Sequence, residues 1–128
     1  MRQKKILIAD KMSQKVEKVF KENNLICDVN TGLDEAELVN LVPNYDAIVV
    51  RSATKITKNI IDAGNNLRVL GRAGIGTDNI DIKAATDKGI VVMNTPYGNS
   101  ITTAEHTISL MMSLARNIPQ ANQSTKKS

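Results

Sequence analysis

The sequence is poor in aromatic residues and contains a single cysteine. Aromatic side chains make up 2% of the 128 residues, and they are Phe20, Tyr45 and Tyr97. A hydrophobic core must therefore be built from aliphatic and methionine side chains, although the apolar share of 41% is ordinary for one globular domain. Because Cys27 is the only cysteine, an internal disulfide is excluded, and we expect a cytoplasmic protein.

The sequence also lacks long apolar runs and clustered positive charge. No apolar stretch approaches the ~20 residues that a membrane-spanning helix needs, and the basic start leads into only four apolar residues, which is not the pattern of a signal peptide. The net charge of +4 comes from 17 basic and 13 acidic residues spread along the chain. We therefore expect neither a membrane nor a nucleic-acid partner. The charge fits a mild attraction to small anions, or simply solvated surface lysines.

Residue types that commonly do catalysis or bind metals are scarce. His106 is the only histidine, it falls in a predicted helix, and a surface or interface position explains it without catalysis. With no second histidine and no cysteine pair, we predict no metal site. We also assign no catalytic residue to this chain.

Short apolar runs alternate with helical patterns along most of the sequence. Each helical pattern begins at a capping residue, namely Ser13, Asp34 with Glu37 three residues later, Thr57 and Asp81. Strands that are apolar throughout and are followed by helices predict a parallel sheet covered on both faces. The expected fold is α/β, a flavodoxin-like doubly wound five-stranded parallel sheet with strand order 2-1-3-4-5. The predicted strands are residues 6–9, 25–30, 47–50, 68–70 and 90–93.

The C-terminal part of the sequence predicts one more helix, which has apolar residues on more than one face. Thr102 and Glu105 form a capping-box pattern, and the helix runs to about Asn117. Its apolar residues occupy more than one face, which predicts cover on more than one side. The helix either packs deeply within its own domain or meets another domain or a second subunit. We therefore divide the chain into a domain of residues 1–98, a crossover helix of residues 99–118 and a frayed tail of residues 119–128.

The strand ends predict where a ligand binds. In an open α/β sheet, ligands bind beyond the carboxyl ends of the strands. Arg51 and Ser52 follow the third predicted strand, Gly74 and Gly76 lie in the loop after the fourth, and Asn99 precedes the last helix. Arginine binds carboxylates and phosphates with two parallel hydrogen bonds, and glycines let backbone N–H groups approach an anion. The alternatives are a surface salt bridge for Arg51, a tight turn for the glycines and a turn residue for Asn99.

Two motifs that suggest other functions are incomplete. Residues 74–79 begin like the dinucleotide fingerprint G-x-G-x-x-G, but Asn79 replaces the third glycine and the helix begins only near Asp81. We therefore predict a substrate loop and no cofactor-binding residues. A phosphate-accepting receiver domain needs an aspartate after the third strand, where this chain has Arg51, so phosphotransfer is not expected.

Five segments resemble the NAD-dependent D-2-hydroxyacid dehydrogenases, and within them the branch that oxidises 3-phosphoglycerate to 3-phosphohydroxypyruvate. The resemblance covers nearly the whole chain. The matching segments are Arg51-Ser-Ala-Thr-Lys-Ile-Thr57, Leu70-Gly-Arg-Ala-Gly-Ile-Gly-Thr-Asp-Asn79, Gly89-Ile-Val-Val-Met-Asn-Thr-Pro-Tyr-Gly-Asn99, Ala104-Glu-His-Thr107 and Leu114-Ala-Arg-Asn-Ile-Pro-Gln120.

The resemblance implies a role for this chain as the substrate-binding segment of such an enzyme. Arg51 would bind an anionic group of a phospho-hydroxy acid, the backbone at Gly74, Ile75 and Gly76 would hold the carboxylate, and Asn99 would lie at the hinge and touch substrate. The helix from Thr102 would contribute to a homo-oligomer. The family's cofactor domain, its NAD site and its catalytic residues are absent, so we expect the chain alone to be inactive. The alternative is a stand-alone small-anion-binding or interaction module.

Overall fold

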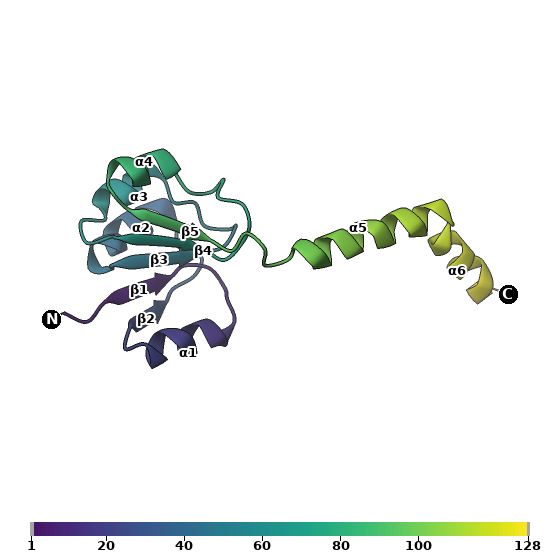
Figure 1. Ribbon diagram of the computed structural model, residues 1–128, viewed down its shortest axis with the longest axis horizontal. Coiled ribbons are helices and arrows are strands. Elements are labelled where there is room, and N and C mark those ends of the chain that lie inside the picture. Colours follow the sequence, from purple (N-terminus) through teal and green to yellow (C-terminus); the bar gives the residue numbers. More distant parts are fainter. Residues whose placement is uncertain (1, 128) are drawn as a thin grey trace. The chain divides into compact units, whose positions relative to one another are not determined.

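The computed structural model of the protein describes the structure of residues 2–127, which form two compact units (Figure 1). The first ends at Pro96 and contains the whole sheet, and the second begins at Tyr97 and contains two helices. None of the helices in the described residues is long and apolar enough to cross a membrane. The division lies within two residues of the boundary that the sequence predicts at 98.

The first unit contains a five-stranded parallel sheet with strand order β2-β1-β3-β4-β5, as predicted. Because β1 lies between β2 and β3, the chain reverses its direction of winding there, which defines a doubly wound sheet. The strand ends differ from the prediction by at most two residues. The strands are β1 (Lys5–Ile8), β2 (Ile26–Val29), β3 (Ala47–Val50), β4 (Val69–Arg72) and β5 (Val91–Asn94).

Predicted capping residues begin the helices of this unit. The Ser13 side chain accepts a hydrogen bond from the Lys15 N–H, and Asp34 forms the full capping box with Glu37. Thr57 stands at the start of its helix but accepts no capping bond, and its hydroxyl donates to Glu35. The helices are α1 (Gln14–Glu22), α2 (Glu35–Leu41), the 3-10 turn η1 (Val42–Asn44), α3 (Lys58–Ala63) and α4 (Ile82–Asp87).

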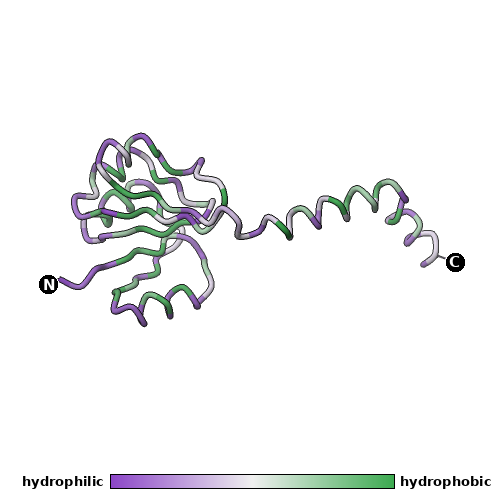
Figure 2. The backbone as a smooth tube through the Cα atoms, viewed as in Figure 1, coloured by the Kyte–Doolittle hydropathy of each residue, from purple (hydrophilic) through white to green (hydrophobic). Residues whose placement is uncertain are grey.

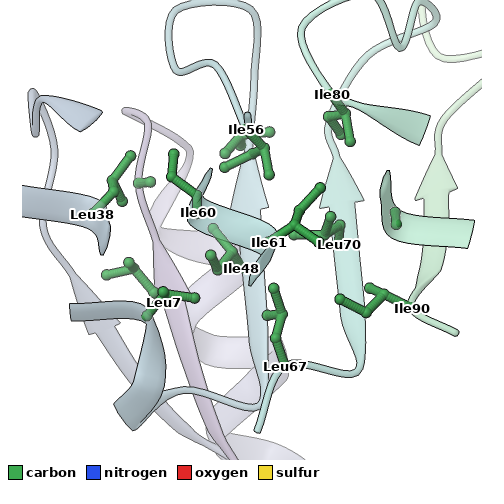
Figure 3. Close-up of a cluster of buried hydrophobic side chains, with 14 of the residues drawn as sticks. Leu7, Leu38, Ile48, Ile56, Ile60, Ile61, Leu67, Leu70, Ile80 and Ile90 are labelled. Atoms are coloured by element: carbon green, nitrogen blue, oxygen red, sulfur yellow. The ribbon is translucent and has the colours of Figure 1, made fainter. Parts of the chain in front are cut away.

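The main core lies between one face of the sheet and helices α2, α3 and α4 (Figure 3). Strand register places Leu7, Ile48 and Leu70 side by side in one row, and each is at most 1% exposed. Ile60 and Ile61 of α3 pack against this row and are fully buried. Burying each such side chain stabilises the fold by roughly 1.5–3 kcal/mol.

The other face of the sheet is only partly covered, which corrects the expectation of two covered faces. Helix α1 packs beside β2, whereas Val91 and Met93 of β5 are 56% and 59% exposed. Between them lies an open apolar groove of about 600 Å³, whose lining includes Phe20 and Val69. The strands that line it are strongly hydrophobic (Figure 2). The sequence pattern was right about apolar strands, but it does not show what covers them.

In the second unit, the structure differs from two predictions: where the first helix begins and whether the last residues are helical. Its first helix, α5 (Ser100–Ala115), begins at Ser100 with Asn99 as N-cap, so Thr102 lies inside the helix and the predicted capping box does not form. Residues 118–127 form helix α6 (Ile118–Lys127) instead of a frayed tail. Pro119 is tolerated in a first helical turn, and Asn117 takes the left-handed conformation with φ of 50° that ends α5.

Candidate anion-binding site

Strands β3 and β4 bring two predicted elements of the site to the same edge of the sheet. In the parallel register Val50 pairs with Arg72, so Arg51 and the turn at residues 74–76 both continue beyond the carboxyl edge. The Ala73 N–H donates to the Val50 carbonyl at 2.9 Å, which joins the two loops where they begin. The prediction that these elements share one edge is confirmed.

The Arg51 guanidinium is exposed and keeps its charge free. Its only side-chain contact among the described residues is a hydrogen bond of 3.4 Å from Nη1 to the Lys11 carbonyl, and it takes part in no ion pair within them. The alternative of a surface salt bridge is therefore wrong. Ser52, the next residue, is also exposed on this edge. An unpaired guanidinium can bind a carboxylate or phosphate at little cost, because it has no protein anion to leave.

Asp10, two residues after β1, fixes the backbone of the Arg51 loop. Its carboxylate accepts hydrogen bonds from the Arg51 N–H at 2.6 Å, from the Thr54 N–H at 3.2 Å and from the Thr54 hydroxyl at 2.6 Å. Burial acts to raise the pKa of Asp10, but the hydrogen bonds from Thr54 and Arg51 outweigh it and lower the pKa. The charge of this buried carboxylate is thus used inside the protein.

Asn79 holds the same loop from the other side. Its Nδ2 donates to the carbonyls of Arg51 and Thr54, both at 2.6 Å, and the residue is 8% exposed. Arg72 adds a longer contact of 3.4 Å from Nε to the Arg51 carbonyl. Residues from the loop after β1, from β4 and from the loop after β4 therefore all fix the main chain from which the Arg51 side chain extends.

The turn at residues 74–76 turns its carbonyls toward the protein. The Gly74 carbonyl accepts from the Thr95 N–H at 3.0 Å, and the Ile75 carbonyl accepts from Nδ2 of Asn94 at 2.7 Å. The Gly76 carbonyl accepts from Nη1 of Arg72. In contrast, the N–H groups of Ile75 and Gly76 have no acceptor within the described part of the chain. Two successive free N–H groups form the kind of donor pair that binds anions.

The glycines of this turn matter for the space they leave, and not for an unusual backbone conformation. Neither Gly74 nor Gly76 has a positive φ, so neither position requires glycine for its backbone conformation. The Gly74 N–H donates to the Arg72 carbonyl at 2.9 Å, so the alternative of a tight turn at the end of the strand stays open. A Cβ at Gly76 would lie 2.8 Å from both Nη1 of Arg72 and Oδ1 of Asp78, whereas one at Gly74 would meet only ordinary contacts. Gly76 therefore leaves room for Arg72 to fasten the turn.

The remaining predicted residues fall in the second unit. Asn99 is the N-cap of α5, but its side chain makes no capping bond there, and His106 is exposed within the same helix. The role of Asn99 in substrate contact stays a prediction. Sequence reasoning gave Asp10, Arg72 and Asn79 no role in the site, since only the folded loops show which groups these side chains bind.

The same loop does not fit NAD. A dinucleotide-binding loop brings the pyrophosphate to the N-terminus of the helix that immediately follows it. Here α4 begins at Ile82, behind its own cap Asp81, and Asn79 is buried under the Arg51 loop instead of allowing the close helix–strand contact of a third glycine. Among the described residues, this loop therefore does not have the geometry of a dinucleotide-binding loop.

The chain that forms this sheet, with Arg51 and the turn at residues 74–76 at the carboxyl edge, matches a known family. The family described as "D-isomer specific 2-hydroxyacid dehydrogenase, catalytic domain" matches residues 6–128. The chain therefore belongs to this family, as the sequence segments predicted.

The curated relatives are more particular. The chain is 53% identical over 97% of its length to D-3-phosphoglycerate dehydrogenase of Synechocystis sp., and 51% identical over 96% to the enzyme of that name from Archaeoglobus fulgidus. It is also 45% identical to human D-3-phosphoglycerate dehydrogenase. The chain spans less than a quarter of the length of these relatives, 22% of the first and 23% of the others.

Solved structures support the same conclusion. An Entamoeba histolytica structure titled as NAD+-bound 3-phosphoglycerate dehydrogenase has a TM-score of 0.76 and 29% identity, covering 88% of this chain and 39% of that one. The D-lactate dehydrogenase of Aquifex aeolicus, solved with NAD and lactic acid, has a TM-score of 0.80 at 21% identity, covers 95% of this chain and 37% of that one, and shows the fold alone.

Proposed function

We propose that this chain supplies one wall of the substrate site in an NAD-dependent D-3-phosphoglycerate dehydrogenase. The supporting observation is that two groups able to bind an anion lie on one edge of the sheet. They are the Arg51 guanidinium, which forms no ion pair among the described residues, and the two free N–H groups of Ile75 and Gly76. The whole enzyme would oxidise 3-phosphoglycerate to 3-phosphohydroxypyruvate with NAD, as the names of the relatives suggest.

3-Phosphoglycerate has an anionic group at each end, and the site offers two separate anion-binding elements. The N–H groups of Ile75 and Gly76 would bind the carboxylate, because backbone donors held in a fixed turn suit a planar anion. Arg51 would bind the phosphate through its planar guanidinium, with the Ser52 hydroxyl beside it. Asn99 would contact substrate from the start of α5. Each charged hydrogen bond would contribute roughly 1.5–3 kcal/mol.

Hydride transfer would need a second wall that these residues do not provide. The glycine turn does not fit NAD, and efficient transfer requires both reactants in one geometry. We therefore expect the chain alone to bind substrate weakly and to show no turnover. We also propose that it acts in the cytoplasm, given its single cysteine, and that it associates with a second copy through α5.

The test is a titration of the ¹⁵N-labelled chain with D-3-phosphoglycerate, followed by NMR. The amide signals of Ile75 and Gly76 and the side-chain Nε signal of Arg51 should shift together with one dissociation constant. Arg51→Gln should weaken binding about tenfold or more while leaving stability within about 0.5 kcal/mol, since the side chain is exposed.

Two results would count against the proposal. One is a titration in which the shifted signals lie away from these residues. The other is an NAD-dependent conversion of 3-phosphoglycerate by the pure chain, which would refute the expected inactivity and require a cofactor site of its own.

A further inference from the structure

The main chain of residues 51–54 is held between an acceptor and a donor. On one side the Asp10 carboxylate accepts the N–H groups of Arg51 and Thr54. On the other side the Asn79 amide donates to the carbonyls of the same two residues. Both N–H groups and both carbonyls at the ends of this loop are therefore bonded to side chains from elsewhere in the fold.

The orientation of the Asn79 amide follows from its surroundings. Turning the amide over would place its oxygen against two carbonyl oxygens at 2.6 Å, which would be repulsive, so Nδ2 must face them. The cost is visible at the other end of the amide, where Oδ1 is buried without a hydrogen-bond partner in the described residues. Most buried polar atoms are hydrogen-bonded, so an unpaired oxygen here calls for an explanation, and the two bonds that Nδ2 donates provide one.

Asn79 also belongs to the other half of the site. It lies three residues after Gly76 in the same loop, and its own carbonyl accepts the Ile56 N–H at 2.8 Å. Loop 51–54 and loop 74–79 are thus fastened directly to each other, and Arg72 strengthens the connection by donating to Gly76 and contacting the Arg51 carbonyl. Bonds within the protein, made by Asn79 and Arg72, therefore hold the main chain at Arg51 at a set separation from the turn at residues 74–76.

We propose that Asn79, opposed by Asp10, is a positioning residue that fixes the distance between Arg51 and the N–H groups of Ile75 and Gly76, and so selects ligands with two anionic ends. This inference rests on the proposed function of the site. A ligand with one anionic group uses either element alone and does not need their separation. A ligand that joins two such groups gains affinity only if both elements are already in place.

The experiment compares two ligands in the chain and in its variants. D-3-Phosphoglycerate and inorganic phosphate are titrated separately, and the ratio of their dissociation constants is the readout. Asn79→Leu removes both hydrogen bonds that Nδ2 donates, and leucine is similar in size to asparagine and uncharged. Asn79→Asp removes the same two bonds with a side chain of the same shape. Both variants should lose at least tenfold in the preference for 3-phosphoglycerate, while inorganic phosphate binding changes less than threefold in Asn79→Leu.

A matched control distinguishes this effect from a general loss of an asparagine. Asn66 donates from Nδ2 to the Pro43 carbonyl at 2.8 Å in an exposed position remote from Arg51. Asn66→Asp makes the same chemical change and should leave the ligand ratio as it is in the unaltered chain. A general effect on folding would instead lower binding of both ligands in parallel.

A second measurement judges the inference even if the site fails to bind 3-phosphoglycerate. Amide hydrogen exchange at Arg51 and Thr54 should be at least tenfold faster in Asn79→Leu, because the loop loses one of its two supports. Exchange at the unaltered rate, or an unaltered ligand ratio in a folded variant, would overturn the inference. If Asn79→Leu does not fold, Thr54→Val, which removes the hydroxyl bond to Asp10 and the longer one to the Ala9 carbonyl, is measured in the same two ways.

Discussion

At the scale of single residues, the candidate site combines side chains that are bonded within the protein with side chains that remain available to a ligand. Arg72 is 10% exposed at its side chain and is used to fasten the turn, whereas Arg51 is exposed and unpaired. The two arginines lie one after the other along the same edge of the sheet, yet one is structural and one is available for a ligand. Side-chain exposure and bonding partners, rather than residue type, separate these roles.

The lowered pKa of Asp46 predicts how the free energy of unfolding changes in acid. Burial acts to raise its pKa, but hydrogen bonds from the Lys5 N–H, Lys4 and Arg2 outweigh it and hold the pKa at about 2. Because this pKa lies below that of an unfolded aspartate, near 3.8, the stabilisation is fully present above about pH 4 and is lost as the pH falls toward 2. Urea unfolding between pH 5 and about 2 should show this loss.

The variant Asp46→Asn provides the control for that pH dependence. It should be less stable than the unaltered chain at neutral pH, and its stability should fall less between pH 4 and 2. Parallel stability curves for the two proteins over this interval would show that Asp46 does not contribute to acid sensitivity.

At the scale of elements, the sequence predicted the sheet well because its signals are local. Four residues without a polar side chain form β3 as expected, and capping at Ser13, Asp34 and Asp81 depends on side chains that lie next to the bonds they make. The Thr102–Glu105 pattern failed because the helix already begins at Ser100. The fastening of Arg51 by Asn79 could not be predicted, since the two are 28 positions apart and no local pattern links them.

The exposed apolar side chains of helix α5 predict that the chain self-associates. Ile108 and Met112 are one turn apart on the helix and are 61% and 60% exposed, and burying each at an interface would contribute roughly 1.5–3 kcal/mol. The average mass in sedimentation should therefore rise with concentration, and Ile108→Glu combined with Met112→Glu should shift the chain toward the monomer.

The added charge needs its own control. Gln14→Glu combined with Asn40→Glu places the same two charges on exposed positions of the first unit and should leave association unchanged. A strictly monomeric profile of the unaltered chain at all concentrations would contradict an interface on α5.

At the scale of the whole molecule, the chain combines a well-packed sheet face with surfaces that remain open. Helices α2, α3 and α4 bury one face of the sheet, whereas the groove beside α1 and most of α5 stay exposed. The chain belongs to the D-isomer specific 2-hydroxyacid dehydrogenases, and the proposed anion site lies at the carboxyl edge of its sheet. The relatives are more than four times as long, and the proposed dehydrogenation belongs to a protein of that size.

The most direct measurement is a crystal structure of this chain with D-3-phosphoglycerate. We predict one ligand molecule with its carboxylate on the N–H groups of Ile75 and Gly76 and its phosphate on the Arg51 guanidinium, with loop 51–54 unmoved. A ligand bound at another part of the chain, or one that reaches only one of the two elements while the other stays in solvent, would contradict the account.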